Sequence, residues 1–213
     1  VVAKRLSEGR VVTAVDMRNH GESPWFQSHR YGDLADDLAR SVETQADILG
    51  HSMGGKAAMV LALEHPEKVR KLVVADIAPV GYSHTQTPLI EAMRGIDLSV
   101  VETRGDADRQ LQATVEDAGV RAFLLQSLDV KARRWRLNLD VLEEEMEHII
   151  GFPNIHGRFD GPTLFLSGGD SDYVLPEHRT RIKEMFPAAV FAKIPGVGHW
   201  LHAEKPREFE AAV

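Results

Sequence analysis

The chain has 213 residues, of which 43% are hydrophobic and 27% are charged. This length suits one globular domain with a sizeable core, or one domain that carries an insertion. The sequence contains no cysteine, which excludes thiol catalysis, disulfide bonds and thiolate metal sites. It also favours a reducing compartment, so we expect a cytoplasmic protein. No apolar stretch reaches the roughly 18 residues that would span a bilayer.

Acidic side chains outnumber basic ones by 32 to 25, which gives a formal net charge of −7. A nucleic-acid binder needs a basic face to neutralise phosphates, so we expect no nucleic-acid partner. One local basic cluster, formed by Lys131, Arg133, Arg134 and Arg136, surrounds Trp135. A solvated turn is the simpler interpretation of this cluster, and an anion or nucleotide site is the alternative.

Short apolar or β-branched stretches alternate with longer amphipathic ones, which predicts parallel strands joined by helices. In chain order we expect a strand over 11–15, a helix over 31–43, a strand over 46–49, a helix over 56–64 and a strand over 72–75. The same alternation resumes after residue 160, with strands over 163–166 and 190–194 and helices over 177–185 and from Pro206 onward.

Between these two parts, residues 77–160 show helical patterns but no buried strand. We expect helices there over 88–93, 106–117, 120–128 and 141–150. The sequence therefore predicts an α/β core of residues 1–76 and 161–213, with a helical cap of residues 77–160 inserted between the third and fourth predicted strands. Both ends of the chain lie inside helical patterns, so we expect further sequence beyond them.

The clearest chemical motif is Gly50-His51-Ser52-Met53-Gly54-Gly55, between a predicted strand and a predicted helix. The pattern G-x-S-x-G is short, but a sharp strand–turn–helix is the context in which it exposes a nucleophilic serine. The amide of Met53 then lies near the helix N-terminus, where it can donate to an oxyanion. An ordinary glycine-rich turn is the alternative.

A serine nucleophile needs a general base from elsewhere in the fold. Of the ten histidines, His199 follows the last predicted strand, at the sheet edge that also carries Ser52. We therefore predict His199 as the base. His51 adjoins the serine and cannot fold back as its base, and His20 is expected in a wall of the active site or in a turn rather than as a catalyst.

The residues alone leave the acidic member of the triad open. Asp76 ends a predicted strand, Asp170 and Asp172 follow the next one, and Asp140 lies in the insertion. A triad is defined by geometry rather than by sequence position, so all four are admissible. Capping of a backbone amide is an equally good explanation for each of them.

These motifs resemble the α/β-hydrolase family, and within it the small esterases of the YbfF type and their mitochondrial relatives. The resemblance rests on five blocks in the family's order: Asp16-Met17-Arg18-Asn19-His20-Gly21-Glu22-Ser23-Pro24, Gly50-His51-Ser52-Met53-Gly54-Gly55-Lys56, Asp76-Ile77-Ala78-Pro79-Val80, Asn138-Leu139-Asp140 and Gly198-His199-Trp200. It implies a mainly parallel sheet, a helical lid and hydrolysis of esters or thioesters without a cofactor. It also implies that Ser52 is the nucleophile and His199 the base.

The resemblance also ranks the candidate acids. In many α/β-hydrolases the acid falls where this chain has Ser171, whereas the YbfF-like pattern uses Asp76. We therefore expect Asp76 first, the pair Asp170 and Asp172 second, and Asp140 third. By the same resemblance, the second oxyanion donor is expected from a segment that precedes Val1.

The leading hypothesis is a serine hydrolase that cleaves small-molecule carboxylic esters or thioesters through an acyl-enzyme. We expect five residues to contact the substrate: His51, His20, Phe123, Leu124 and Trp200. For the two apolar cap residues among them, packing in a core is an equal alternative. Competing functions are a cofactor-free haloperoxidase or C–C hydrolase with the same triad, or a non-catalytic binding module. We expect no metal or other cofactor, and a monomer or homodimer.

Overall fold

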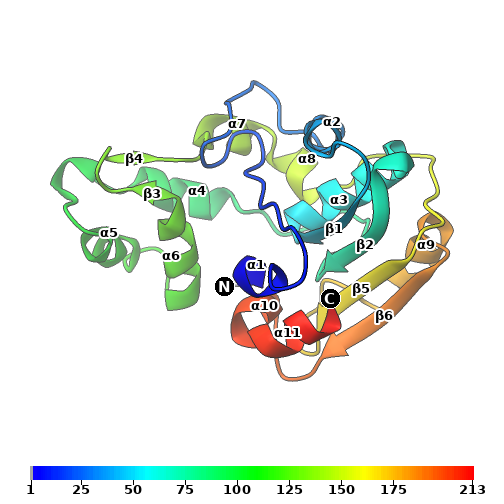
Figure 1. The fold of residues 1–213 in the computed structure, drawn as a ribbon. Helices are drawn as coiled ribbons and strands as arrows, with labels where there is room; N and C mark the ends of the chain where they lie inside the picture. The colour runs from blue at the N-terminus through cyan, green and yellow to red at the C-terminus, as the bar shows by residue number, and fades with distance from the viewer. Residues whose placement is uncertain (1) are drawn as a thin grey trace. The chain divides into compact units, whose positions relative to one another are not determined.

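The computed structural model describes residues 2–213, which form two compact units (Figure 1). The first unit contains the chain up to Val15, Arg30–Gly81 and Gly151–Val213. The second unit contains Asp16–His29 and Tyr82–Ile150. Each unit buries a hydrophobic core of its own.

A four-stranded parallel sheet forms the centre of the first unit. Its strand order is β1-β2-β5-β6, with the bounds Ala46–His51 (β1), Val69–Ala75 (β2), Thr163–Gly168 (β5) and Ala189–Ile194 (β6). The inner strands bury Val74 and Phe165 almost completely, as is usual where both faces of a sheet are covered. Because all four strands run the same way, the turns at their carboxyl ends meet at one edge of the sheet.

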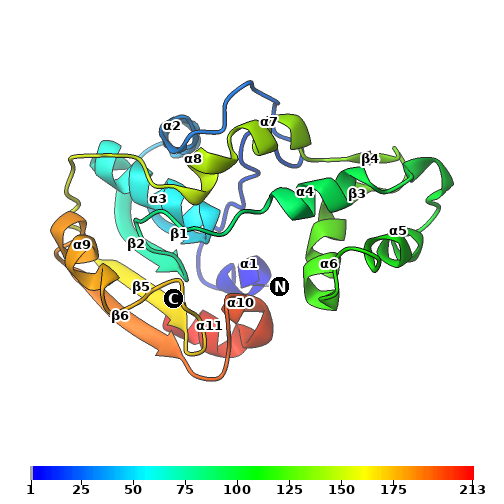
Figure 2. The ribbon, with the colours of Figure 1, turned by 180° about the vertical axis from the view of Figure 1, so that it is seen from behind.

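Helices pack around this sheet. They are α1 (Val2–Leu6), α2 (Tyr31–Ser41), α3 (Met53–Glu64), α9 (His178–Met185), α10 (Leu201–Glu204) and α11 (Pro206–Ala212), with a 3₁₀ turn at Pro66–Lys68. Helix α3 is the most enclosed, with every residue from Gly55 to Leu63 buried, which matches its apolar sequence on all faces. Figures 1 and 2 show α1 beside α11, where Arg5 forms an ion pair of 3.0 Å with Glu210.

The second unit is mainly helical. Its elements are α4 (Thr87–Arg94), α5 (Arg104–Leu111), α6 (Ala118–Leu124), α7 (Leu139–Glu144) and α8 (Met146–Ile150), 3₁₀ turns at Leu98–Val100 and Leu125–Ser127, and a hairpin of β3 (Leu128–Asp129) and β4 (Arg134–Trp135). Trp135 is buried in its core, and the indole N–H donates to the carbonyl of Met93 at 3.0 Å. Helix α5 begins at a capping box formed by Thr103 and Asp106.

The loop of residues 16–29 belongs to this second unit through the side chain of Asn19. Its Oδ1 accepts hydrogen bonds from the Phe26 amide at 2.8 Å and from Asn138 Nδ2 at 3.1 Å, and its Nδ2 donates to the Ser28 carbonyl at 3.0 Å. Asn19 is fully buried, so this network satisfies a polar side chain that would otherwise be costly to bury. The segment 16–29 was not expected to join the insertion.

The predicted α/β fold with a mainly parallel sheet is confirmed, but the predicted strand over residues 11–15 is wrong. These residues form no strand in the structure, and Val11 is 97% exposed. A strand needs a neighbour to take its backbone hydrogen bonds, and an apolar β-branched stretch does not show whether that neighbour exists. The insertion consequently lies between the second and third strands of the sheet rather than between the third and fourth.

The expected helices of the insertion form with shifted bounds. The one expected over 106–117 is α5, which starts at its Thr103 cap and ends at Leu111; the one expected over 120–128 becomes α6 and a 3₁₀ turn. The one expected over 141–150 divides at Glu145 into α7 and α8. Across residues 2–213, the structure has no helix with the length and hydropathy needed to cross a membrane.

Candidate active site

Ser52 lies in a strained turn between β1 and α3. Its φ of 53° and ψ of −123° are unusual for a residue with a side chain. The turn is fixed by the Ser52 amide, which donates to the Ala75 carbonyl at 3.0 Å. A Cβ added at Gly50 would lie 2.2 Å from the Gly54 carbonyl oxygen, so glycine is required there. This is the geometry of a nucleophile elbow, in which backbone strain holds the serine hydroxyl out of the turn.

The structure brings Ser52, His199 and Asp76 into one chain of hydrogen bonds. His199 Nε2 lies 3.0 Å from Ser52 Oγ, and His199 Nδ1 lies 2.8 Å from Asp76 Oδ2. A carboxylate only accepts hydrogen bonds, so Nδ1 carries the proton of the neutral ring and Nε2 is left to accept from the serine hydroxyl. This is the tautomer that a general base for Ser52 requires.

Asp76 is fully buried directly after β2, and every contact on its carboxylate comes from a donor. Oδ1 accepts the Gly168 amide at 2.9 Å, and Oδ2 accepts both His199 and the hydroxyl of Ser171, the latter at 2.5 Å. Asp76 has a positive φ of 52°, and its amide donates to the Leu166 carbonyl at 2.9 Å. These donors offset the cost of burying the charge and fix the carboxylate towards the imidazole.

The loop after β6 presents His199. His51 donates from Nε2 to the carbonyl oxygen of His199 at 2.8 Å, which ties this loop to the end of β1. The ring of Tyr173 is stacked on the His199 ring, with centroids 4.1 Å apart and an interplanar angle of 22°. The His51 ring is also close, at 4.6 Å between centroids. The orientation of the imidazole is thus set by packing as well as by its two hydrogen bonds.

Burial keeps the neighbouring histidines neutral. It lowers the pKa of His51 to about 3, with a smaller contribution from the charge on His199. Burial also lowers the pKa of His202, again with His199 as the second cause. Neutral neighbours place no further positive charge beside the His199 ring.

Lys56, the last residue of the Gly50–Lys56 motif, is buried in helix α3. Its side chain is 1% exposed, and Nζ donates to the Gly151 carbonyl at 2.6 Å. Burial lowers its pKa to about 7. A lysine in the first turns of a helix whose next seven residues are apolar is a sequence signal that could have drawn attention to it.

The other candidate acids lie in different surroundings. The Asp170 amide donates to the Val197 carbonyl at 3.0 Å, which links the loop after β5 to the loop that carries His199. Asp140 is in the second unit, where its carboxylate pairs with Arg94 at 2.6 Å. The carboxylate hydrogen-bonded to His199 is that of Asp76, and no sequence motif predicted the Ser171 hydroxyl on the same carboxylate.

The predicted substrate-contact residues divide between the two units. Trp200 packs beside His199 and His51 in the first unit, with ring centroids 5.5 and 5.8 Å away. His20 is in the second unit, where Nδ1 lies 3.0 Å from the Arg18 carbonyl and burial lowers its pKa. 

The two apolar cap residues also differ. Phe123 is 49% exposed, whereas Leu124 lies in the core of the second unit.

Met53 is the first residue of α3, so its amide stands at the N-terminus of that helix. Across residues 2–213 no three histidine or carboxylate side chains gather as metal ligands would.

Comparisons with known proteins agree with this architecture. A model of the alpha/beta hydrolase family matches residues 1–212. The sn-1-specific diacylglycerol lipase ABHD11 of Mus musculus is 43% identical over 218 residues, which cover 96% of this chain and 71% of the relative. Esterase YbfF of Escherichia coli (strain K12) is 38% identical, covering 97% and 82%.

Solved structures give the same result. A marine microorganism esterase has a TM-score of 0.93 and 38% sequence identity, covering 99% of this chain and 86% of its own. The crystal structure of E-2-(acetamidomethylene)succinate hydrolase has a TM-score of 0.72 at 21% identity, which supports the fold alone. The resemblance inferred from the motifs is therefore confirmed: the chain belongs to the alpha/beta hydrolase family.

Proposed function

We propose that this protein is a serine hydrolase that cleaves carboxylic ester or thioester bonds through an acyl-enzyme. The observation that carries the proposal is the hydrogen-bonded chain from Ser52 Oγ through His199 to the buried Asp76. Two relatives that match most of the chain are named as an esterase and a diacylglycerol lipase, which supports the same class of reaction.

In the first half of the reaction Ser52 Oγ attacks the acyl carbon while His199 Nε2 takes the hydroxyl proton. Asp76 stabilises the resulting imidazolium through the Nδ1 proton. Nε2 then returns its proton to the departing alkoxide or thiolate, which leaves as an alcohol or thiol. In the second half His199 takes a proton from water, hydroxide attacks the acyl carbon, and Ser52 leaves with that proton as the acid is released.

The amide of Met53 is proposed as one donor to the oxyanion that forms in both halves of the reaction. It stands at the N-terminus of α3, where backbone N–H groups and the helix dipole favour negative charge. Loss of one such donor typically lowers kcat by about 100- to 1000-fold.

We further propose a small-molecule acyl substrate, a substrate-selecting role for the insertion, and a cytoplasmic location. The cysteine-free sequence supports the location. Trp200 and His51, whose rings pack beside His199 in the first unit, are the proposed substrate neighbours. The proposed assembly is a monomer or a homodimer.

Fluorophosphonate labelling followed by intact-mass measurement tests the nucleophile. We expect one adduct per chain, lost in Ser52→Ala and kept in the control Ser41→Ala, whose hydroxyl lies at the exposed end of α2. Hydrolysis of p-nitrophenyl esters should likewise be lost in Ser52→Ala and kept in Ser41→Ala. An adduct that persists in Ser52→Ala, or a folded wild type that neither labels nor hydrolyses, would overturn the proposal.

A further inference from the structure

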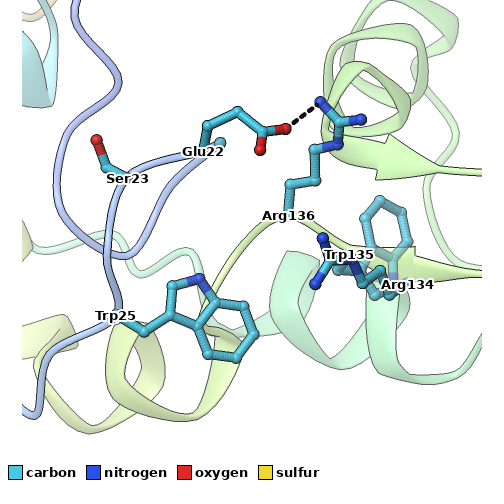
Figure 3. A pocket seen from close by; sticks show the side chains of 7 residues that line it. Glu22, Ser23, Trp25, Arg134, Trp135 and Arg136 are labelled. Carbon is cyan, nitrogen blue, oxygen red and sulfur yellow. Dashed lines mark ion pairs between the residues drawn. The ribbon is translucent and has the colours of Figure 1, made fainter. Parts of the chain in front are cut away.

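A pocket in the second unit lies among residues that the proposed reaction does not use. It has a volume of about 280 Å³. Gly21, Glu22, Ser23 and Trp25 of the 16–29 loop form one wall, and Arg134, Trp135 and Arg136 of the β4 segment form the other. Figure 3 shows these two walls and the ion pair of Glu22 with Arg136 that connects them.

The backbone holds both walls in place. The Gly21 amide donates to the Arg136 carbonyl at 2.8 Å, and the Glu22 amide donates to Asp16 Oδ2 at 3.0 Å. A Cβ at Gly21 would overlap the Asp16 carboxylate, and the φ of Gly21 is 57°. The pocket is therefore formed before any ligand arrives, as is usual for small-molecule sites.

Most polar groups in these walls already have partners. Arg136 pairs with Glu22 at 2.8 Å and with Asp129 at 2.9 Å. The Trp135 N–H is taken by the Met93 carbonyl. These groups support the pocket but are not available to a ligand.

Two lining side chains remain available. The indole of Trp25 is 56% exposed. The guanidinium of Arg134 is exposed and has no hydrogen bond or ion pair to the residues that the structure describes. An exposed indole face and an exposed guanidinium together suit a ligand with a planar ring and an anionic group.

Charge near Arg134 favours a multiply charged anion. Lys131 and Arg133 lie in the turn that leads into β4, both exposed and, within residues 2–213, without a side-chain partner. Arg133 has a φ of 52°, a strained value for a residue other than glycine. Lys131, Arg133 and Arg134 form no ion pair within residues 2–213, although the charge of Arg134 also acts on Asp129, and such a cluster stands out in a chain of net charge −7. A phosphate monoester carries about −1.5 to −2 at neutral pH, whereas a carboxylate carries one charge.

We propose that this pocket binds an organic phosphate that carries a planar aromatic ring, with the ring against Trp25 and the phosphate at Arg134. The ring packs on the indole as bases stack on exposed aromatic side chains. The guanidinium donates two parallel hydrogen bonds to phosphate oxygens. This binding is independent of the proposed esterase reaction, because none of its residues belongs to the Ser52 site.

Isothermal titration calorimetry with AMP as the probe tests the proposal. We expect one site with a Kd below about 1 mM. Three compounds should each bind at least about tenfold more weakly than AMP. Adenosine lacks the phosphate, inorganic phosphate lacks the ring, and benzoate carries a single negative charge. Arg134→Gln should weaken AMP binding by about tenfold or more, and Trp25→Leu by about fivefold or more.

Arg207→Gln, on the exposed face of α11, is the matched control and should leave the Kd unchanged. Both wall residues changed are exposed, so thermal midpoints within about 2 °C of wild type should confirm that the variants fold. Absence of AMP binding would overturn the proposal. So would binding that Arg134→Gln and Trp25→Leu leave unchanged, or adenosine, phosphate or benzoate binding as tight as that of AMP.

Discussion

Replacing Asp76 by asparagine should disable the proposed base while leaving the local packing intact. Asparagine has the same shape, and its Oδ1 can keep the hydrogen bond from the buried Gly168 amide, 2.9 Å away in the wild type. Turning the amide around would set two donors against each other there, at a cost of about 1 to 3 kcal/mol. The Asn NH₂ group therefore faces His199 Nδ1, where the wild type has an acceptor.

The consequence is a change of tautomer. Nδ1 must now accept a hydrogen bond, so the ring proton moves to Nε2, which then points at Ser52 Oγ and can no longer take its proton. The negative charge that stabilised the imidazolium is lost as well. The equivalent change in a serine-protease triad lowers kcat about 10⁴-fold. We expect kcat/KM to fall by about 10³ to 10⁴, or roughly 4 to 5.5 kcal/mol at 1.36 kcal/mol per tenfold.

Hydrolysis of p-nitrophenyl butyrate, with a thermal melt to show that the variant is folded, measures this effect. Asp170→Asn and Asp172→Asn are matched controls and should stay within about threefold of wild type. A folded Asp76→Asn enzyme with kcat/KM within tenfold of wild type would refute the assignment of Asp76. A large loss in either control instead would identify a different acid.

Four further predictions concern the surroundings of the site. Gly50→Ala should lower the free energy of unfolding by about 2 kcal/mol or more in a urea titration, because its Cβ would overlap the Gly54 backbone; Gly54→Ala, which meets no atom within 4 Å, should not. His51→Ala should lower kcat by about tenfold by releasing the His199 carbonyl, and His51→Gln, which keeps a donor, should recover most of it; equal activity in both variants would contradict this role. The unfolding free energy should fall as the pH drops from about 6.5 towards 3, because the unfolded chain then protonates His51 while the folded chain does not, and His51→Gln should flatten that slope. By the same relation Lys56, with its pKa lowered to about 7, should make stability rise between about pH 7 and 10.5, a rise that Lys56→Met should remove.

The elements that the sequence predicted best are those fixed by local patterns. The turn at Ser52 was predictable because the motif G-x-S-x-G between a strand and a helix is typical of one sharp turn, and all its determinants lie within six consecutive residues. The absence of a strand over 11–15 was not predictable, because an apolar β-branched pattern carries no information about a pairing partner. That the 16–29 loop belongs to the second unit was not predictable for a similar reason. It depends on the hydrogen bond between the side chains of Asn19 and Asn138, which are 119 residues apart in the chain.

The acidic member of the proposed triad likewise could not be predicted from the residues alone. Three strand-end aspartates, Asp76, Asp170 and Asp172, were chemically equivalent in the sequence, and only the resemblance ranked them. The distance of 2.8 Å between Asp76 and His199 depends on the positive φ of Asp76 and on donors from the β5 turn. Side-chain contacts of this kind, like the Ser171 hydroxyl on the same carboxylate, follow from the assembled fold rather than from a motif.

The ends of the inserted segment meet, and this has an evolutionary consequence. The Tyr82 amide donates to the Ile150 carbonyl at 3.1 Å, so the segment leaves and rejoins the sheet-bearing part of the chain at neighbouring points. A segment closed in this way can change in length and sequence at little entropic cost to the sheet. The sheet-bearing part can therefore accept exchange of residues 82–150 as one module, provided that the incoming module still offers an amide to Asn19.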